Sequence, residues 1–127
     1  MLDIQSQSEQ IDILVKVEYS SLNYKDGLSF YGNKGVSSNY PHTPGIDAMG
    51  TVKSSNSPNI KIGAKVIVSG YDLGMNTAGG FGEYIRVPQE WVSILPDGLN
   101  SLDSMIIGTA GLTAGLCVNS IEVLNHV

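Results

Sequence analysis

The chain has 127 residues, 42% of them hydrophobic and 15% charged, which allows one domain with a core and excludes most two-domain enzymes. Its formal net charge of -5, from twelve acidic and seven basic residues, argues against a basic face and therefore against a nucleic-acid partner. The single cysteine, Cys117, cannot form an internal disulfide, and its apolar neighbours predict a buried thiol in a reducing compartment.

The N-terminus carries no sign of a targeting segment. Residues 1–5 have neither a basic start nor an apolar stretch behind them, and we find no later segment of membrane-spanning length that is free of polar residues. These features predict a cytoplasmic protein with no membrane partner.

The first two-thirds of the chain predicts β-structure. Over residues 11–19 apolar and polar side chains alternate with the two-residue period of a strand. Shorter alternations at 46–52, 65–68, 81–87 and 91–95 predict four more strands, and the polar segment 54–59 predicts a hairpin turn. Five short strands are typical of a small barrel or sandwich.

A different pattern begins at Ser101, where a nearly continuous apolar run predicts a buried helix. Asn100 or Ser101 can cap its start, and Asp103 in the first turn is favourable against the helix dipole. Each glycine in this helix costs about 1 kcal/mol relative to alanine, so close packing against the helix is expected. Because no lysine or arginine follows Arg86, this last part would expose an apolar surface, and we interpret the chain as part of a longer protein.

The segment after the first predicted strand, residues 20–26, gathers hydrogen-bond donors, acceptors and an aromatic ring. Such a cluster at a strand end can face a cleft. Asn23 and Asp26 have an alternative role, because residues of these types also cap a turn or short helix. Both interpretations stay open on spacing alone.

A second polar segment surrounds His42, which lies between two prolines, with Asp47 as the first polar residue of the strand that follows. A histidine can be a general base or a metal ligand. With no second histidine nearby, His42 is predicted to be a solvated loop residue.

A third cluster, residues 108–115, contains three glycines and two threonines. Small residues can cradle a phosphate, but this segment lacks the spacing of a dinucleotide fingerprint and has no Walker lysine. Helix packing is therefore favoured, with Thr109 and Thr113 one turn apart and available to line a ligand cleft.

Taken in chain order, four strings resemble the medium-chain dehydrogenase/reductase superfamily. They are Ser-Leu-Asn-Tyr-Lys-Asp at 21–26, Pro-Gly-Ile-Asp at 44–47, Gly-Gly-Phe-Gly-Glu-Tyr at 79–84 and Met-Ile-Ile-Gly-Thr-Ala-Gly-Leu-Thr-Ala at 105–114. Within that superfamily the sequence is most similar to the zinc-independent branch of quinone oxidoreductase-like and acrylyl-CoA reductase proteins. The resemblance extends from about Ile13 to the end of the chain.

This resemblance implies a mainly β fold. Residues 1–100 would form a GroES-like catalytic domain, a partly open β-barrel without the family's opening strand. Residues 101–127 would form a helical segment leading into a nucleotide-binding Rossmann domain that this sequence does not contain. The zinc enzymes of the superfamily carry a cysteine where this chain has Asn23. They carry Gly-His-Glu where it has Gly-Ile-Asp at 45–47, so no metal is expected.

The resemblance also implies a reaction: hydride transfer from NADPH to the β-carbon of an enone, a quinone or an acrylyl thioester. Asn23 and Tyr24 are the predicted catalytic residues, both as candidate hydrogen-bond donors to the substrate's carbonyl oxygen, and Tyr24, Thr109 and Thr113 are the predicted cofactor-binding residues. The proton donor is unassigned, since Lys34 stands where some relatives carry a tyrosine. Residues 26–44 are expected to form a mobile substrate-covering loop or a disordered one.

For the full-length protein we expect a small-molecule substrate and a homodimer, and for the isolated chain no activity. The alternative is a stand-alone GroES-like interaction module, or a gene remnant, with no catalytic activity.

Overall fold

The computed structural model describes residues 12–125. The predictions for residues 1–11 and 126–127, including the N-terminal targeting analysis and the first residue of the first strand, lie outside the described residues.

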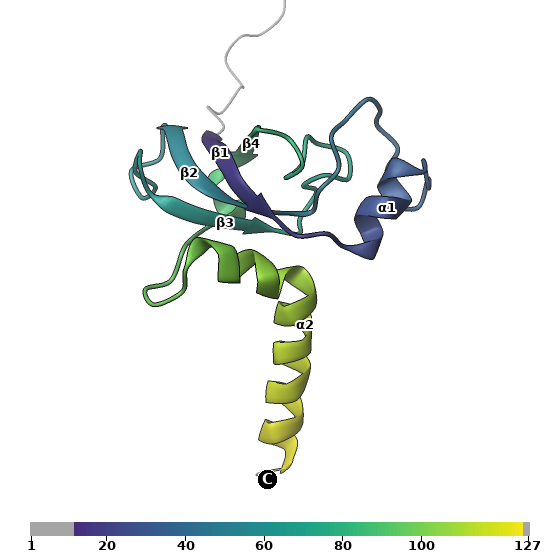
Figure 1. The fold of residues 1–127 in the computed structure, drawn as a ribbon, viewed down its shortest axis with the longest axis vertical. Helices are drawn as coiled ribbons and strands as arrows, with labels where there is room; N and C mark the ends of the chain where they lie inside the picture. Colours follow the sequence, from purple (N-terminus) through teal and green to yellow (C-terminus); the bar gives the residue numbers. More distant parts are fainter. Residues whose placement is uncertain (1–11, 126–127) are drawn as a thin grey trace, which may run out of the picture.

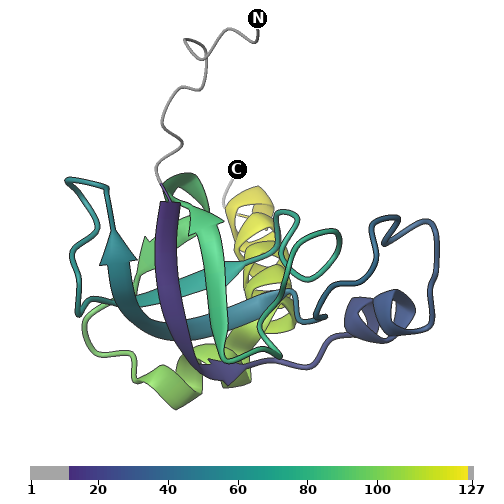
Figure 2. The same ribbon diagram turned by 90° about the horizontal axis from the view of Figure 1, so that it is seen from above.

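A curled antiparallel sheet of five strands forms the body of the molecule (Figures 1 and 2). The strands are β1 (Asp12–Ser20), β2 (Asp47–Ser55), β3 (Lys65–Ser69), β4 (Tyr84–Pro88) and β5 (Val92–Ile94). Their order in the sheet is β4-β1-β2-β3-β5. All five strand predictions are confirmed, with ends moved by up to three residues, and the 54–59 segment lies in the predicted hairpin between β2 and β3. The short 3-10 helix η2 (Gln89–Trp91) precedes β5.

The fourth strand starts later than its apolar alternation predicts. Residues 79–82 form a turn whose N–H groups bind carbonyls of the segment before β2: Gly80 N–H donates to Gly45 O at 2.9 Å and Phe81 N–H to Pro44 O at 3.1 Å. Tertiary hydrogen bonds therefore override the local strand pattern there.

The core lies inside the curl of the sheet. It is built from the inward-facing residues of β1 to β4 and two loop residues: Ile13, Val15, Ala48, Val52, Ile60, Val66, Val68, Leu73, Ile85 and Val87. Two register shifts in β1, after Leu14 and between Val17 and Tyr19, increase its curl and carry the end of the strand beyond the core. The chain leaves β1 toward α1 (Tyr24–Phe30) in this way.

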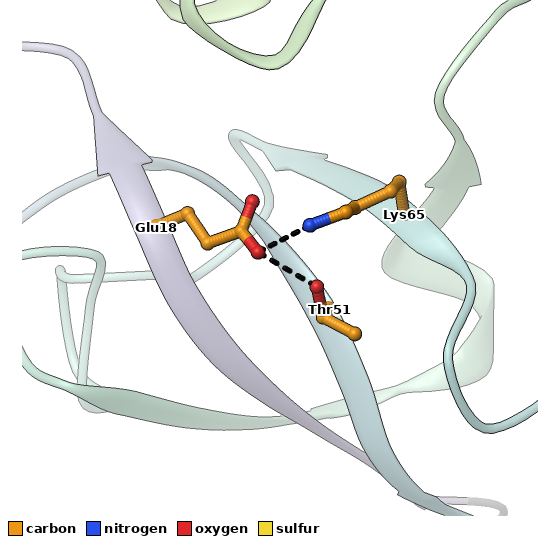
Figure 3. A network of polar contacts seen from close by, with 3 residues as sticks. All are labelled: Glu18, Thr51 and Lys65. Carbon is orange, nitrogen blue, oxygen red and sulfur yellow. Dashed lines mark hydrogen bonds and ion pairs between the residues drawn. The ribbon is translucent and has the colours of Figure 1, made fainter.

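The outer surface of the sheet carries a polar network, drawn in Figure 3. The Glu18 carboxylate accepts hydrogen bonds from Lys65 Nζ and from Thr51 Oγ1, the latter at 2.8 Å. The hydrogen bond from Lys65 holds the pKa of Glu18 below its usual value.

Helix α1 begins at a cap that the sequence left as one of two interpretations. Asn23 is its N-cap residue, and the Asp26 carboxylate accepts the backbone N–H of Asn23 at 2.7 Å. The capping role of Asn23 and Asp26 is confirmed.

The segment after α1 is tied back onto that helix. Ser29 Oγ, which is buried, lies 2.7 Å from Ser37 Oγ and 2.7 Å from His42 Nε2. His42 Nδ1 lies 2.8 Å from Asn39 O. The prediction of a solvated His42 is therefore wrong: the ring is half-buried, and both its nitrogens have protein partners because the chain folds back over α1. The loop expected over residues 26–44 is wrong for its first part, since residues 26–30 belong to α1, and the mobility expected for this segment stays a prediction.

Helix α2 (Ser101–Asn125) bends at Gly108, whose backbone leaves the helical region with φ 53° and ψ -164°. The predicted cap is confirmed, since Asn100 Oδ1 accepts the N–H of Asp103 at 2.7 Å. The inner half of α2, residues 101–107, lies along the sheet, and the outer half, residues 109–125, projects away from it (Figure 1).

The prediction that the whole of this helix is buried is wrong. Only Ser104, Met105 and Gly108 are buried, and Cys117, predicted to be a buried thiol, is exposed. Within the described part of the chain residues 112–125 of the outer half are all exposed, so its apolar side chains face outward. α2 is also long and apolar enough to cross a membrane, with a mean hydropathy of 1.4 over its best window, contrary to our expectation for any segment of the chain. One such helix is weak evidence for a membrane span.

Candidate active site

Four elements meet on one side of the sheet: the end of β1, the start of α1, the start of β2 and the bend of α2. Ser20 Oγ donates to Asp47 O at 2.6 Å, which ties the end of β1 to β2. The hydroxyl of the next residue, Ser21, donates to the carbonyl of Met105 in α2. The chain just before Asn23 and Tyr24 is therefore hydrogen-bonded both to β2 and to α2.

Asp47 is the centre of this junction. Its carboxylate is completely buried and accepts three hydrogen bonds, from Asn23 Nδ2 at 3.0 Å, from the backbone N–H of Thr109 at 2.9 Å and from Thr109 Oγ1 at 2.6 Å. Between residues 12 and 125 the one ion pair is Lys65–Glu18, so hydrogen-bond donors rather than a cation compensate the burial of Asp47.

Asp26 is a second buried carboxylate in the same junction. It accepts the backbone N–H of Asn23 at 2.7 Å and that of Ile46 at 2.9 Å. Asp26 thus joins the start of α1 to the residue before β2. Asn23 bonds both carboxylates, through its backbone to Asp26 and through its side chain to Asp47.

The bend of α2 fits against this junction because residue 108 has no side chain. A Cβ atom at Gly108 would lie 2.6 Å from Ser21 Oγ and 3.1 Å from Asp47 Oδ2. Its positive φ, with an extended ψ, is a conformation that is essentially restricted to glycine. The glycine predicted to serve packing does so here, and it also allows the helix to turn.

Two open pockets flank the junction. One, of about 310 Å³, is lined by residues 19–23 on one side and by residues of α2 between 102 and 110 on the other. The second, of about 580 Å³, lies against α1 and is lined by Leu22, Asn23, Tyr24, Gly27, Leu28 and Tyr31. Tyr24, 85% exposed, is available at the edge of the second pocket to a ligand or to another part of the protein.

Some of the predicted site residues lie together at the junction, and one lies further out. Asn23 and Thr109 share the Asp47 carboxylate, and Tyr24 follows Asn23 directly. Thr113 is exposed one turn further out, and its Oγ1 donates to Thr109 O at 2.8 Å. Both threonine hydroxyl hydrogens are thus used inside the protein, which leaves lone pairs for a ligand.

Sequence reasoning did not assign Asp47 to the site. The available signal was its position as the first polar residue after Pro-Gly at the start of a strand whose next residues are apolar. That position predicts burial, and a buried carboxylate requires partners. The described residues, 12–125, contain no group of three His, Cys, Asp or Glu side chains arranged to hold a metal ion.

The comparisons with known proteins define the class of domain. Residues 9–97 match the alcohol dehydrogenase GroES-like domain, and the chain belongs to that family, as a domain of the medium-chain dehydrogenase/reductase type. The predicted GroES-like fold is confirmed.

Its particular relatives are acrylyl-CoA and quinone reductases. The chain is 43% identical over 118 residues to a probable acrylyl-CoA reductase of Escherichia coli, covering 93% of this chain and 36% of that protein. It is 46% identical over 110 residues to a putative quinone oxidoreductase of Bacillus subtilis, covering 87% and 33%. The chain therefore spans about a third of the length of these relatives.

Solved structures agree with this placement. An oxidoreductase of Salmonella enterica in complex with NADP has a TM-score of 0.84 at 44% identity, covering 96% of this chain and 37% of that one. A Bacillus subtilis protein with NAD bound has a TM-score of 0.82 at 42% identity, covering 95% and 36%. The predicted resemblance to the quinone oxidoreductase and acrylyl-CoA reductase branch is confirmed.

Proposed function

We propose that this chain is the GroES-like catalytic part of an NADPH-dependent oxidoreductase that reduces an activated double bond of the enone, quinone or acrylyl-CoA type. The observation that carries the proposal is identity of 42% to 46% over most of the chain with relatives named as such reductases. Solved relatives bound to NADP, NADPH or NAD support a nicotinamide cofactor, and two of those three contain the phosphorylated form.

The residues around α1 fit a nicotinamide. The ring has two apolar faces and a polar carboxamide, and Tyr24 offers an exposed aromatic face beside a pocket of mixed apolar and polar lining. A reduced nicotinamide held here would supply the hydride for the β-carbon of the substrate, becoming oxidised, and the proton for the α-carbon would come from solvent. This chain has to hold the reacting carbons close together and exclude water.

We assign Tyr24 to direct contact with the cofactor and Asn23 to the same cleft beside it. The amide of Asn23 already donates to Asp47 Oδ2 at 3.0 Å and approaches Ser21 O at 3.5 Å. Those contacts favour a role in which Asn23 fixes the position of Tyr24 over one in which it donates to the substrate oxygen. Thr109 and Thr113 would close the cleft from α2, with their remaining lone pairs as acceptors.

The same proposal includes independence from zinc. Asn23 and Ile46 stand at the positions where the zinc enzymes of the superfamily carry ligands, and neither side chain is a zinc ligand of the usual kind. Metal analysis of the purified protein tests this part, and stoichiometric zinc would contradict it. A homodimeric, cytoplasmic enzyme acting on a small molecule completes the proposal.

A hybrid enzyme tests the function directly. This chain replaces the corresponding N-terminal third of the Escherichia coli relative, and NADPH oxidation is followed with acrylyl-CoA and with a quinone. We expect NADPH consumption equal to the double bonds reduced. A hybrid that folds and binds NADPH but reduces neither substrate would contradict the proposal.

Tyr24→Ala in the hybrid is expected to lower kcat/KM by about tenfold or more, because the ring that positions the nicotinamide is lost. Tyr24→Phe, which keeps the ring, should retain most of the activity. Tyr84→Ala, on β4, is the control for loss of a partly exposed tyrosine elsewhere. Equal rates for Tyr24→Ala and the control would contradict the assignment of Tyr24.

A second candidate is a stand-alone interaction module without activity, and the exposed apolar outer half of α2 favours it. The two candidates differ in whether this chain can complete an active enzyme. Both predict no measurable NADPH binding by the isolated chain, so the hybrid separates them: a module gives a folded but inactive hybrid.

A further inference from the structure

The backbone around Gly108 exchanges a helical hydrogen bond for two tertiary ones. In a regular helix the N–H of Thr109 would pair with the carbonyl of Met105, four residues earlier. Here the N–H of Thr109 donates to Asp47 Oδ2 at 2.9 Å, and the carbonyl of Met105 accepts from the hydroxyl of Ser21. The bend is thus held by partners from β2 and from the end of β1.

Asp47 is placed as a cap for the outer half of α2. The first residue of this outer half, Thr109, binds the carboxylate twice, through its N–H and through Oγ1 at 2.6 Å. A negative charge at a helix N-terminus is favourable because it opposes the positive end of the helix dipole. The cap comes from another element, so it also fixes the direction of the helix relative to the sheet.

We propose that Asp47 is a positioning residue whose carboxylate clasps the bend of α2 and sets the direction in which the outer half leaves the sheet. The same carboxylate holds the side chain of Asn23 at 3.0 Å, so one buried group couples the start of α1 to the helix direction. One consequence rests on the proposed function. If that function holds, Asp47 aligns the side of the cleft that carries Tyr24 with the part of the reductase that packs on the outer half of α2.

The chain itself supplies a reporter of that direction. It has one tryptophan, Trp91 beside β5, and one cysteine, Cys117, exposed on the outer half of α2. A fluorescent acceptor on Cys117 therefore measures the distance from the sheet to the outer half by energy transfer from Trp91. Hydrogen exchange of the Thr109 amide measures the stability of its hydrogen bond to the Asp47 carboxylate, which we call the clasp.

Two substitutions weaken the clasp. Asp47→Asn replaces an accepting oxygen by an amino group, and Thr109→Val removes one donor while keeping the shape of the side chain. Each is expected to shift and broaden the Trp91–Cys117 distance distribution, and Asp47→Asn should speed exchange of the Thr109 amide by about tenfold or more. Thr109→Ser, which keeps the hydroxyl, should restore the wild-type distance distribution.

Asp26→Asn is the matched control. Asp26 is as buried as Asp47 and also binds Asn23, but it has no bond to α2, so its substitution should leave the energy transfer unchanged. Gly108→Ala and Gly115→Ala form a second pair. A Cβ at 108 meets Ser21 and Asp47, whereas one at 115 meets nothing within 4 Å, so only Gly108→Ala should shift the distance.

The result that would overturn the clasp is a folded Thr109→Val or Asp47→Asn chain with wild-type energy transfer and wild-type Thr109 exchange. Should Asp47→Asn fail to fold, Thr109→Val and Gly108→Ala still decide. None of these measurements needs a cofactor, so the clasp can fail while the proposed function stands, and the reverse. In the hybrid enzyme Asp47→Asn should lower kcat more than it changes the KM for NADPH, and an unchanged kcat would overturn the positioning role.

Discussion

The apolar side chains of the sheet are buried, whereas those of the outer half of α2 are exposed. In the sheet, the alternating side chains of β1 to β4 turn into one closed core, with Ile13 and Val52 fully buried. In the outer half, large apolar side chains such as Leu116 and Ile121 are more than half exposed. The apolar side chains of the sheet thus find their partners within the described residues, whereas the outer half has the composition of a buried helix but no cover there.

The largest expected effect separates the two regions by stability. Ile85→Ala, in the core, should lower the free energy of unfolding by about 2–5 kcal/mol, because it leaves a cavity. Leu116→Ala, on the outer half, should change it by less than about 0.5 kcal/mol. Urea unfolding followed by far-UV circular dichroism measures both, and equal losses would show that the outer half is packed.

The next effect concerns self-association. Exposed apolar residues on the outer half should bring copies of the chain together, and Ile121→Glu should weaken that association by about tenfold, since burying one such side chain contributes about 1.5–3 kcal/mol. Ile62→Glu is the matched control, because Ile62 is also exposed but lies in the loop before β3. Sedimentation velocity measures the association, and a wild-type monomer at high concentration would contradict the prediction.

A smaller effect tests whether hydrogen bonds order the segment after α1, as apolar packing orders the sheet. His42→Ala removes the partner of Ser29 Oγ and of Asn39 O, and it should cost about 1 kcal/mol in the free energy of unfolding. Amide exchange in residues 31–43 should rise at the same time. A variant with wild-type exchange there would show that these hydrogen bonds do not order the segment.

The smallest effect lies on the outer surface of the sheet. The pKa of Glu18 is lowered, mainly by its hydrogen bond from Lys65, so the pair stabilises the folded state at neutral pH and loses this contribution as the pH falls below about 4. Both side chains are partly exposed, so Lys65→Ala should cost no more than about 1 kcal/mol at neutral pH. The stability of wild type and variant should converge in acid, and a difference that persists at pH 3 would contradict this account.

The sequence was sufficient for features that depend on neighbouring residues. The alternation through Ile13 and Val15 predicts β1 because the period of a strand is local, and Asn100 predicts the start of α2 for the same reason. The resemblance of the four strings to one superfamily predicts the GroES-like fold.

The junction at Asp47 depends on contacts between residues far apart in the chain. Asp47 meets Asn23 from 24 positions away and Thr109 from 62. No local pattern relates these three residues, and although a glycine at 108 permits a bend, the local sequence does not reveal its close approach to Ser21 and Asp47. The burial of Cys117 was predicted wrongly because a composition suited to packing does not say whether the partner is within the chain.

We propose that this chain, which spans about a third of the length of its relatives, is part of a longer nicotinamide-dependent reductase. The most direct test is to read the natural transcript beyond the codon for Val127. The account predicts that the following codons encode a β-strand, a glycine-rich turn and a helix, the pattern of a dinucleotide-binding unit. A stop codon there in the natural transcript would contradict hydride transfer by this product and would favour the interaction module.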